Sequence, residues 1–164
     1  MSYDEEQSRD VYAHYGLTMY LAQVLEYAIV SAFVILRLPE KQKYTREDID
    51  DLMDGRFKKT LGMLLKTLRD EMTLPETLEA TLSQALARRN FLAHHYFRER
   101  AEQFVTREGR AKMIVELQID QQLFQSADTA LSGVLRPMRI ANGLTDQALD
   151  ERYHRMCEKL GIKP

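Results

Sequence analysis

Residues 17–36 read LTMYLAQVLEYAIVSAFVIL, and no proline interrupts the chain between Asp4 and Leu38. Apolar side chains recur through this stretch at helical spacing. They are Leu17, Leu21, Val24, Leu25, Ala28, Ala32 and Ile35. The pattern predicts one long helix from about Asp4 to Leu38. Its second half, Tyr27 to Leu36, is apolar on every side, so we expect it to be either sandwiched between other helices or shared with a second chain.

The same helix has to be weighed as a membrane span. The uncharged run from Tyr27 to Leu36 is short, and extending it towards the N-terminus brings in Glu26 and Gln23. A span needs about 20 predominantly apolar residues. We therefore expect a helix of a protein core and no membrane contact.

The overall composition is that of an ordinary soluble, helical protein. The chain has 164 residues, 45% of them hydrophobic and 29% charged, with only seven glycines and four prolines. This length suits one domain over residues 1–164, and the scarcity of turn residues favours long helices over short strands. The formal charge of -2 argues against a protein that coats nucleic acid over its whole surface.

Two features of the sequence favour a reducing, cytoplasmic environment. Cys157 is the single cysteine, which excludes a disulfide or a cysteine-based metal cluster within one chain. The opening residues MSYDEE are acidic and lack the basic and apolar regions of a secretory signal. We expect a cytoplasmic protein.

Further helices are expected along the rest of the chain. Phe57, Leu61, Leu64, Leu65 and Leu68 form a helical stripe that ends near Met72. A short helix is expected from Thr45 to Met53, and a longer one from Pro75, as its first-turn proline, to about Ala101. Two more are expected: one from Arg107 to the Pro137 region, and an amphipathic one after Gly143 that Thr145 caps. The expected fold is all-α, an up-and-down bundle of four long helices plus one or two short helices.

Residues 88–97 read RRNFLAHHYF and gather two arginines, an asparagine and two of the four histidines on one expected helix. At 100° per residue, Arg89 and Tyr96 project into the centre of the apolar stripe. That stripe is formed by Leu78, Leu82, Ala85, Leu86, Leu92 and Ala93. A guanidinium in such a place needs an anionic partner, and Glu26 in the first helix is a candidate.

The cluster has the groups needed to act on a phosphodiester. Asn90 and His94 are four residues apart and share a face, about 100° or more from Arg89, so the arginine has to reach round or the helix has to be distorted. A guanidinium offers a planar fork to phosphate oxygens, and an imidazole can move a proton on and off a ribose hydroxyl. This chemistry needs neither a metal nor a cofactor.

The surrounding segment is basic. Residues 85–112 hold seven basic side chains against three acidic ones. The basic residues are Arg88, Arg89, Arg98, Arg100, Arg107, Arg110 and Lys112, and the acidic ones are Glu99, Glu102 and Glu108. This local surplus favours an anionic ligand.

The pattern Arg89-Asn90-x-x-x-His94-x-Tyr96 resembles the signature of HEPN domains, which are helical bundles with a ribonuclease site. The resemblance implies a metal-independent endoribonuclease, active as a homodimer whose paired motifs line a cleft between the subunits. It further implies that His94 takes part in proton transfer for attack of the 2′-hydroxyl, that Arg89 contacts the phosphate and that Asn90 orients the site. Tyr96 matches the tyrosine of the toxin branch, which a nucleotidyltransferase antitoxin can modify.

The leading hypothesis is therefore an enzyme, a cytoplasmic toxin or defence component that cleaves RNA with His94 and Arg89. Arg88, His95 and Arg98 are candidates for further RNA contacts, although we expect His95 to face the solvent. The alternative is a non-catalytic bundle that binds RNA, a nucleotide or a protein partner through the basic segment 88–112.

Each of these residues also has a purely structural interpretation. Arg89 could form a structural ion pair with Glu26, and His94 could be a hydrogen-bonded histidine on a helix surface. Tyr96 fits a core residue better than a modification target. Arg88 could be a solvated charge.

Overall fold

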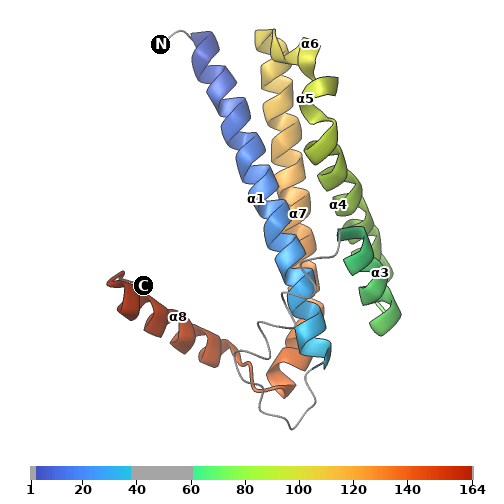
Figure 1. Cartoon of the computed structure of the whole chain (residues 1–164), viewed down its shortest axis with the longest axis vertical. Helices are drawn as coiled ribbons and strands as arrows, with labels where there is room; N and C mark the ends of the chain where they lie inside the picture. Colours follow the sequence, from blue (N-terminus) through green and yellow to red (C-terminus); the bar gives the residue numbers. More distant parts are fainter. Residues whose placement is uncertain (1–2, 38–60, 164) are drawn as a thin grey trace.

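The computed structural model describes residues 3–37 and 61–163, and this part of the chain is helical and has no strand (Figure 1). Its helices are α1 (Tyr3–Arg37), α3 (Leu61–Glu71), α4 (Glu76–His94), α5 (Tyr96–Glu99), α6 (Ala101–Phe104), α7 (Arg107–Ala141) and α8 (Asp146–Leu160). The all-α class is confirmed. The expected short helix from Thr45 to Met53 lies outside the described residues, as does Phe57.

Two helices of 35 residues each, α1 and α7, lie side by side and form the main axis of the bundle (Figure 1). They run in the same direction. At their beginnings Gln7 donates to the carbonyl oxygen of Arg107 over 3.1 Å, and at their ends Asn142 donates to the carbonyl oxygen of Ile35 over 3.3 Å. The helix α4 runs the opposite way beside them, with α3 against its lower half.

The core explains the all-round apolar half of α1. Of the segment from Tyr27 to Leu36, five residues are almost completely buried within this chain. They are Ile29, Val30, Ala32, Phe33 and Val34. On α7 the periodic residues Met113, Leu117, Phe124 and Leu131 are buried too. Contacts within this chain therefore account for these five residues, whereas Tyr27 is 54% exposed and Ala28, Ser31 and Ile35 are partly exposed. A second chain over the remaining surface of this segment stays a prediction.

By length and composition alone, the part of α1 from Glu5 to Leu36 could cross a membrane. The helix that packs in the core of a soluble protein passes the same test. In this fold α1 buries one side against α7, and Glu26 near its middle is ion-paired. The absence of a membrane span stays a prediction.

The expectation of one continuous helix from Pro75 to Ala101 is wrong. Pro75 is the N-cap residue and not the first-turn proline, and α4 ends at His94. The backbone leaves helical geometry at His95 (φ −130°, ψ −23°) and again at Arg100 (φ −106°, ψ 10°), which separates the short helices α5 and α6. No glycine or proline marks either break, so side-chain contacts with α7 have to account for them.

The last two helices begin at side-chain caps. Thr106 accepts a hydrogen bond from the backbone N–H of Gly109, and α7 continues through Pro137 to Ala141, a little beyond the expected end. The predicted cap of α8 is confirmed, because Thr145 accepts a hydrogen bond from the N–H of Ala148. Figure 1 shows α8 leaving the lower end of α7 and diverging from the bundle on the side of α1.

Candidate functional site

Arg89 lies between α4 and α1, as the sequence pattern predicts, and Glu26 is its partner. The Nε atom of Arg89 lies 2.9 Å from Oε1 of Glu26, and the two side chains are 29% and 23% exposed. This is an ion pair without a well-aligned hydrogen bond to that oxygen. The pair is therefore half-buried and remains open to solvent on one side.

The guanidinium of Arg89 also reaches round the helix. Its Nη1 atom donates a hydrogen bond of 3.3 Å to Oδ1 of Asn90, the next residue. Asn90 is exposed, and His94 follows it one turn later on the same face. The arginine thus contacts the polar face of α4 without any distortion of the helix.

His94 and His95 end α4, and both side chains are exposed. Their ring centroids are 6.2 Å apart. Nδ1 of His95 lies 2.9 Å from Nη2 of Arg98, whose side chain is 73% exposed. The expectation that His95 faces the solvent is confirmed, and His94 does so as well. In an ideal helix His94 stands about 140° from Arg89.

Together these residues form an open strip at the upper end of α4. We call Arg89, Asn90 and His94 the α4 strip. Ala93, which we expected in the buried stripe, is exposed beside the α4 strip. The strip offers a guanidinium, an amide and an imidazole to a ligand at the surface.

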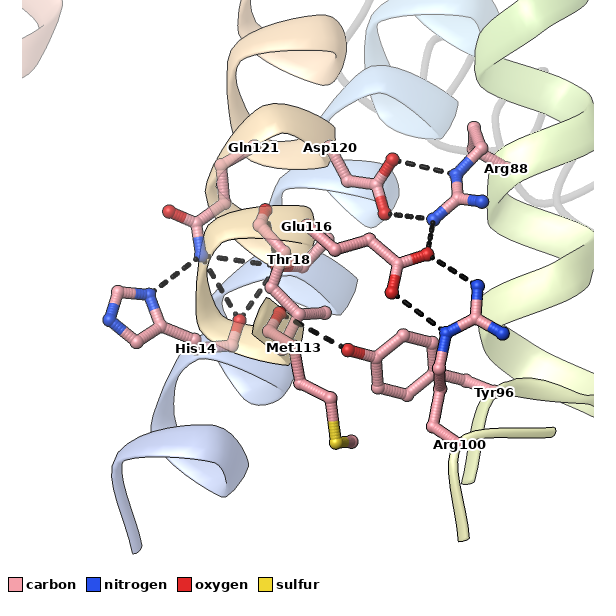
Figure 2. Close-up of polar contacts among 10 residues, drawn as sticks. His14, Thr18, Arg88, Tyr96, Arg100, Met113, Glu116, Asp120 and Gln121 are labelled. Atoms are coloured by element: carbon pink, nitrogen blue, oxygen red, sulfur yellow. Dashed lines mark hydrogen bonds and ion pairs between the residues drawn. The ribbon is translucent and has the colours of Figure 1, made fainter. Parts of the chain in front are cut away.

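Arg88 does not face a ligand, which corrects the expectation of a solvated or RNA-binding residue. Its Nε and Nη2 atoms donate to Oδ1 and Oδ2 of Asp120 over 2.7 and 2.6 Å, and Nη2 also donates to Oε1 of Glu116 over 3.0 Å (Figure 2). The hydrogen bond to Asp120 raises the pKa of Arg88 against the opposing effect of burial. These bonds fix α4 to α7.

Arg100 belongs to the same network, because it bonds to Glu116 as Arg88 does (Figure 2). Its Nε and Nη2 atoms donate to the two carboxylate oxygens of Glu116 over 2.9 and 2.8 Å. Both guanidinium groups lie over the ring of Phe91, that of Arg88 at 4.8 Å and that of Arg100 at 5.1 Å from its centroid. We refer to Arg88, Arg100, Glu116 and Asp120 as the α4–α7 network.

Sequence reasoning missed the two acidic members of this network. One signal could have found Asp120, because it falls on the buried stripe of α7 between Leu117 and Phe124. A carboxylate in that position needs a cation, just as a buried arginine needs an anion. Glu116 gives no such signal, since its position on α7 is half-buried.

Tyr96 belongs to the core, which confirms the structural interpretation. The residue is 1% exposed, its hydroxyl donates to the carbonyl oxygen of Met113 over 3.3 Å, and its ring stacks on Tyr15 at 5.7 Å. Burial, reinforced by the charge of Glu116, raises its pKa. In this conformation the hydroxyl is not accessible to a modifying enzyme.

The basic surface is smaller than the composition of residues 85–112 indicates. Three of its seven basic side chains point inwards, namely Arg88, Arg100 and Arg110. Arg110 is 5% exposed and donates to the side chain of Gln7 and the carbonyl oxygen of Phe104, each over 3.0 Å. The local surplus of positive charge therefore serves the fold in large part.

Comparison of the chain with protein-family models, with curated proteins and with solved structures finds no match. Within residues 3–37 and 61–163, no group of three or more histidine, cysteine, aspartate or glutamate side chains is placed to hold a metal ion. The geometry of the α4 strip is thus the main structural guide to function.

Proposed function

We propose that the protein is a HEPN-like, metal-independent endoribonuclease of the cytoplasm, a toxin or defence component that acts as a homodimer. One observation carries the proposal: Arg89 donates a hydrogen bond to Asn90 and so turns a partly exposed guanidinium towards the face that holds His94. A cation fork and an imidazole on one strip suit a phosphodiester substrate.

The proposed reaction is an internal transfer at phosphorus. His94 removes the proton of the ribose 2′-hydroxyl, the 2′-oxygen bonds to the adjacent phosphorus, and the bond to the 5′-oxygen breaks. The products are a 2′,3′-cyclic phosphate and a 5′-hydroxyl, which receives a proton from an imidazolium. In a homodimer the paired strip of the second subunit supplies that acid, and Arg89 neutralises charge on the phosphate.

Glu26 sets a condition on this mechanism. Its carboxylate is ion-paired with the guanidinium of Arg89 in the free protein. A bound phosphate therefore has to displace Glu26 or bind the same guanidinium beside it. The pair is half-buried, and Oε1 of Glu26 receives no well-aligned hydrogen bond from the guanidinium. A phosphate with two oxygens facing the fork can therefore compete with it.

The test is cleavage of a mixed pool of single-stranded RNA by the full chain and by His94→Ala. We expect wild type to cut in the presence of EDTA and to leave cyclic phosphate ends. The variant should lose cleavage by about a hundredfold or more while its RNA binding is kept. His154→Ala is the matched control, because this histidine is exposed on α8, away from the strip.

A wild-type protein that binds RNA but never cuts it would contradict the proposal and favour the alternative binding module. Loss of cutting on chelation would contradict the metal-free mechanism. Modification of Tyr96 by an antitoxin is left out of the proposal, because the buried hydroxyl would first have to be exposed.

A further inference from the structure

The helix α8 has an apolar face that no described helix covers. Leu149, Tyr153, Met156 and Leu160 follow one another at helical spacing, and their exposed fractions run from 39% to 63%. Figure 1 shows this helix extending away from the bundle. An exposed stripe of this kind marks an interaction surface.

The first residue of that face meets the bundle. Leu149 lines a groove of about 490 Å³ whose other walls come from α1 and α7. The walls are formed by Ala28, Ser31 and Ile35 of α1 and by Ser132, Gly133, Leu135, Arg136 and Arg139 of α7. α8 and the outer surface of α1 and α7 therefore form an open V with this groove at its apex.

The angle of the V is held by polar contacts. Asp146, at the start of α8, forms ion pairs with Arg136 and Arg139 of α7. Asn142, just after α7, donates to the carbonyl oxygen of Ile35 on α1, and Arg139 also donates to the carbonyl oxygen of Leu144. Closing α8 onto its own bundle would break these contacts. Within residues 3–37 and 61–163, no other segment is placed to cover the exposed apolar face of α8.

Apart from Arg136 and Arg139, which pair with Asp146, the two sides of the V carry opposite charges. Asp128 lies one turn before Ser132 on α7; it is half-buried, and no residue in the described ranges pairs with it. Burial raises its pKa. On α8, a basic edge borders the apolar face and shares a hollow with it, formed by Arg152, Arg155 and Lys159. Arg155 already pairs with Glu151 one turn earlier, over 3.9 Å. A half-buried carboxylate without a cation and the exposed side chains of Arg152 and Lys159 suit each other.

We propose that the V takes the α8 helix of a second copy of this chain, and that the two copies exchange their α8 helices about a two-fold axis. Each copy supplies one apolar helix and one V, which is the self-complementary arrangement of a closed dimer. The basic edge of each α8 then faces Asp128 of the other copy. This inference stands on α8 and does not rest on RNA cleavage, so it survives a dimeric protein that never cuts RNA. A monomeric wild type, by contrast, would count against both proposals.

The first test measures the dimer dissociation constant of the full chain by sedimentation. Met156→Glu places a charge on the apolar face, and His154→Glu places the same charge on the opposite face of α8 as a control. We expect a dimer for wild type and the control, and a dissociation constant raised about a hundredfold for Met156→Glu. Circular dichroism checks that all three remain folded. A monomeric wild type, or two variants that behave alike, overturns the proposal.

A second test asks which chain supplies α8. Ser132→Cys and Met156→Cys are placed on separate chains in a Cys157→Ser background and mixed under oxidation. Exchange predicts a covalent dimer. The control is a single chain that carries both new cysteines. If it forms an internal disulfide, α8 folds back onto its own bundle and the proposal is overturned. A monomer whose α8 binds anionic vesicles overturns it as well.

Charge reversal gives an independent readout. Asp128→Arg and Arg152→Glu should each weaken the dimer, and the double variant should recover most of the affinity of wild type. Additive losses in the double variant contradict the predicted contact.

Discussion

Arg88 and Asp120 form a two-pronged ion pair across the interface of α4 and α7, with both guanidinium–carboxylate contacts at 2.7 Å or less. The carboxylate is almost fully buried, at 4% exposure, whereas the guanidinium is 26% exposed. Glu116 and Arg100 extend this pair to the chain beyond the break at His95. The α4–α7 network thus ties α4 and α7 to the break between α5 and α6, where Arg100 lies, and holds the α4 strip in place.

Removing one charge of this pair should be costly. Asp120→Asn leaves Arg88 with only Glu116 as an anionic partner, so we expect the free energy of unfolding to fall by about 2 kcal/mol, less than for a fully buried pair because Arg88 is partly solvated. Urea denaturation measures the loss. Asp70→Asn, the same change at an exposed site on α3, should have little effect. Equal stability of the two variants would contradict a structural role for the network.

Glu116 should make stability depend on acid pH. Burial disfavours its charge, but hydrogen bonds from Arg100 and Arg88 outweigh burial and place its pKa below the usual 4.5. A carboxyl group with a lowered pKa stabilises the fold above about 4.5, and this contribution is lost as the pH falls through the folded-state pKa. Glu116→Gln should therefore be less stable than wild type at neutral pH.

The difference between the two proteins should shrink as the pH falls below about 4.5. Denaturant unfolding at a series of pH values measures it. Glu102→Gln, at an exposed position on α6, should follow the wild-type profile. A difference between Glu116→Gln and wild type that stays constant with pH would rule out this linkage.

Gly109 permits the close approach of α6 to the start of α7. A Cβ atom there would overlap the backbone carbonyl group of Gln103, which no side-chain rotation can relieve. We expect Gly109→Ala to destabilise the protein by about 1–3 kcal/mol. In Gly16→Ala the new methyl group meets no atom within 4 Å, so helix propensity should make that variant equal to wild type or slightly more stable. Thermal unfolding compares them, and equal melting temperatures for both variants would contradict the steric account.

The sequence predicts those features that depend on local periodicity and capping. The bounds of α1, the start of α7 and the cap at Thr145 all follow from apolar spacing and N-cap chemistry. The sequence also predicts the partner of Arg89, because Glu26 is an isolated charge in an apolar helix. In each case the information lies within a few helical turns.

The break at His95 depends instead on contacts between distant residues. The sequence around it favours a continuous helix, yet the chain turns so that Tyr96 reaches Met113 and Arg100 reaches Glu116. Tertiary contacts of this kind override helix propensity. The same reason explains why Arg88 was expected to be solvated. Its position on α4 gives no sign of the carboxylates on α7 that pair with it.

The pair of Arg89 and Glu26 allows structural and functional roles to be separated. Arg89→Met strands the half-buried Glu26, so we expect a loss of about 1–2 kcal/mol. The double variant Arg89→Met/Glu26→Leu replaces both charges by apolar groups and should return close to wild-type stability, because such replacements are often neutral. If the arginine serves only to hold α1 against α4, the double variant should match wild type in every other property, including any action on RNA.

The ribonuclease proposal makes a different prediction for the same double variant. Its stability should recover, but cleavage and the salt-dependent part of RNA binding should not, since the guanidinium that meets the phosphate is gone. Denaturant unfolding and cleavage of the RNA pool, measured on the same preparations, give the two readouts. A stable double variant that cleaves RNA as fast as wild type would remove Arg89 from the site.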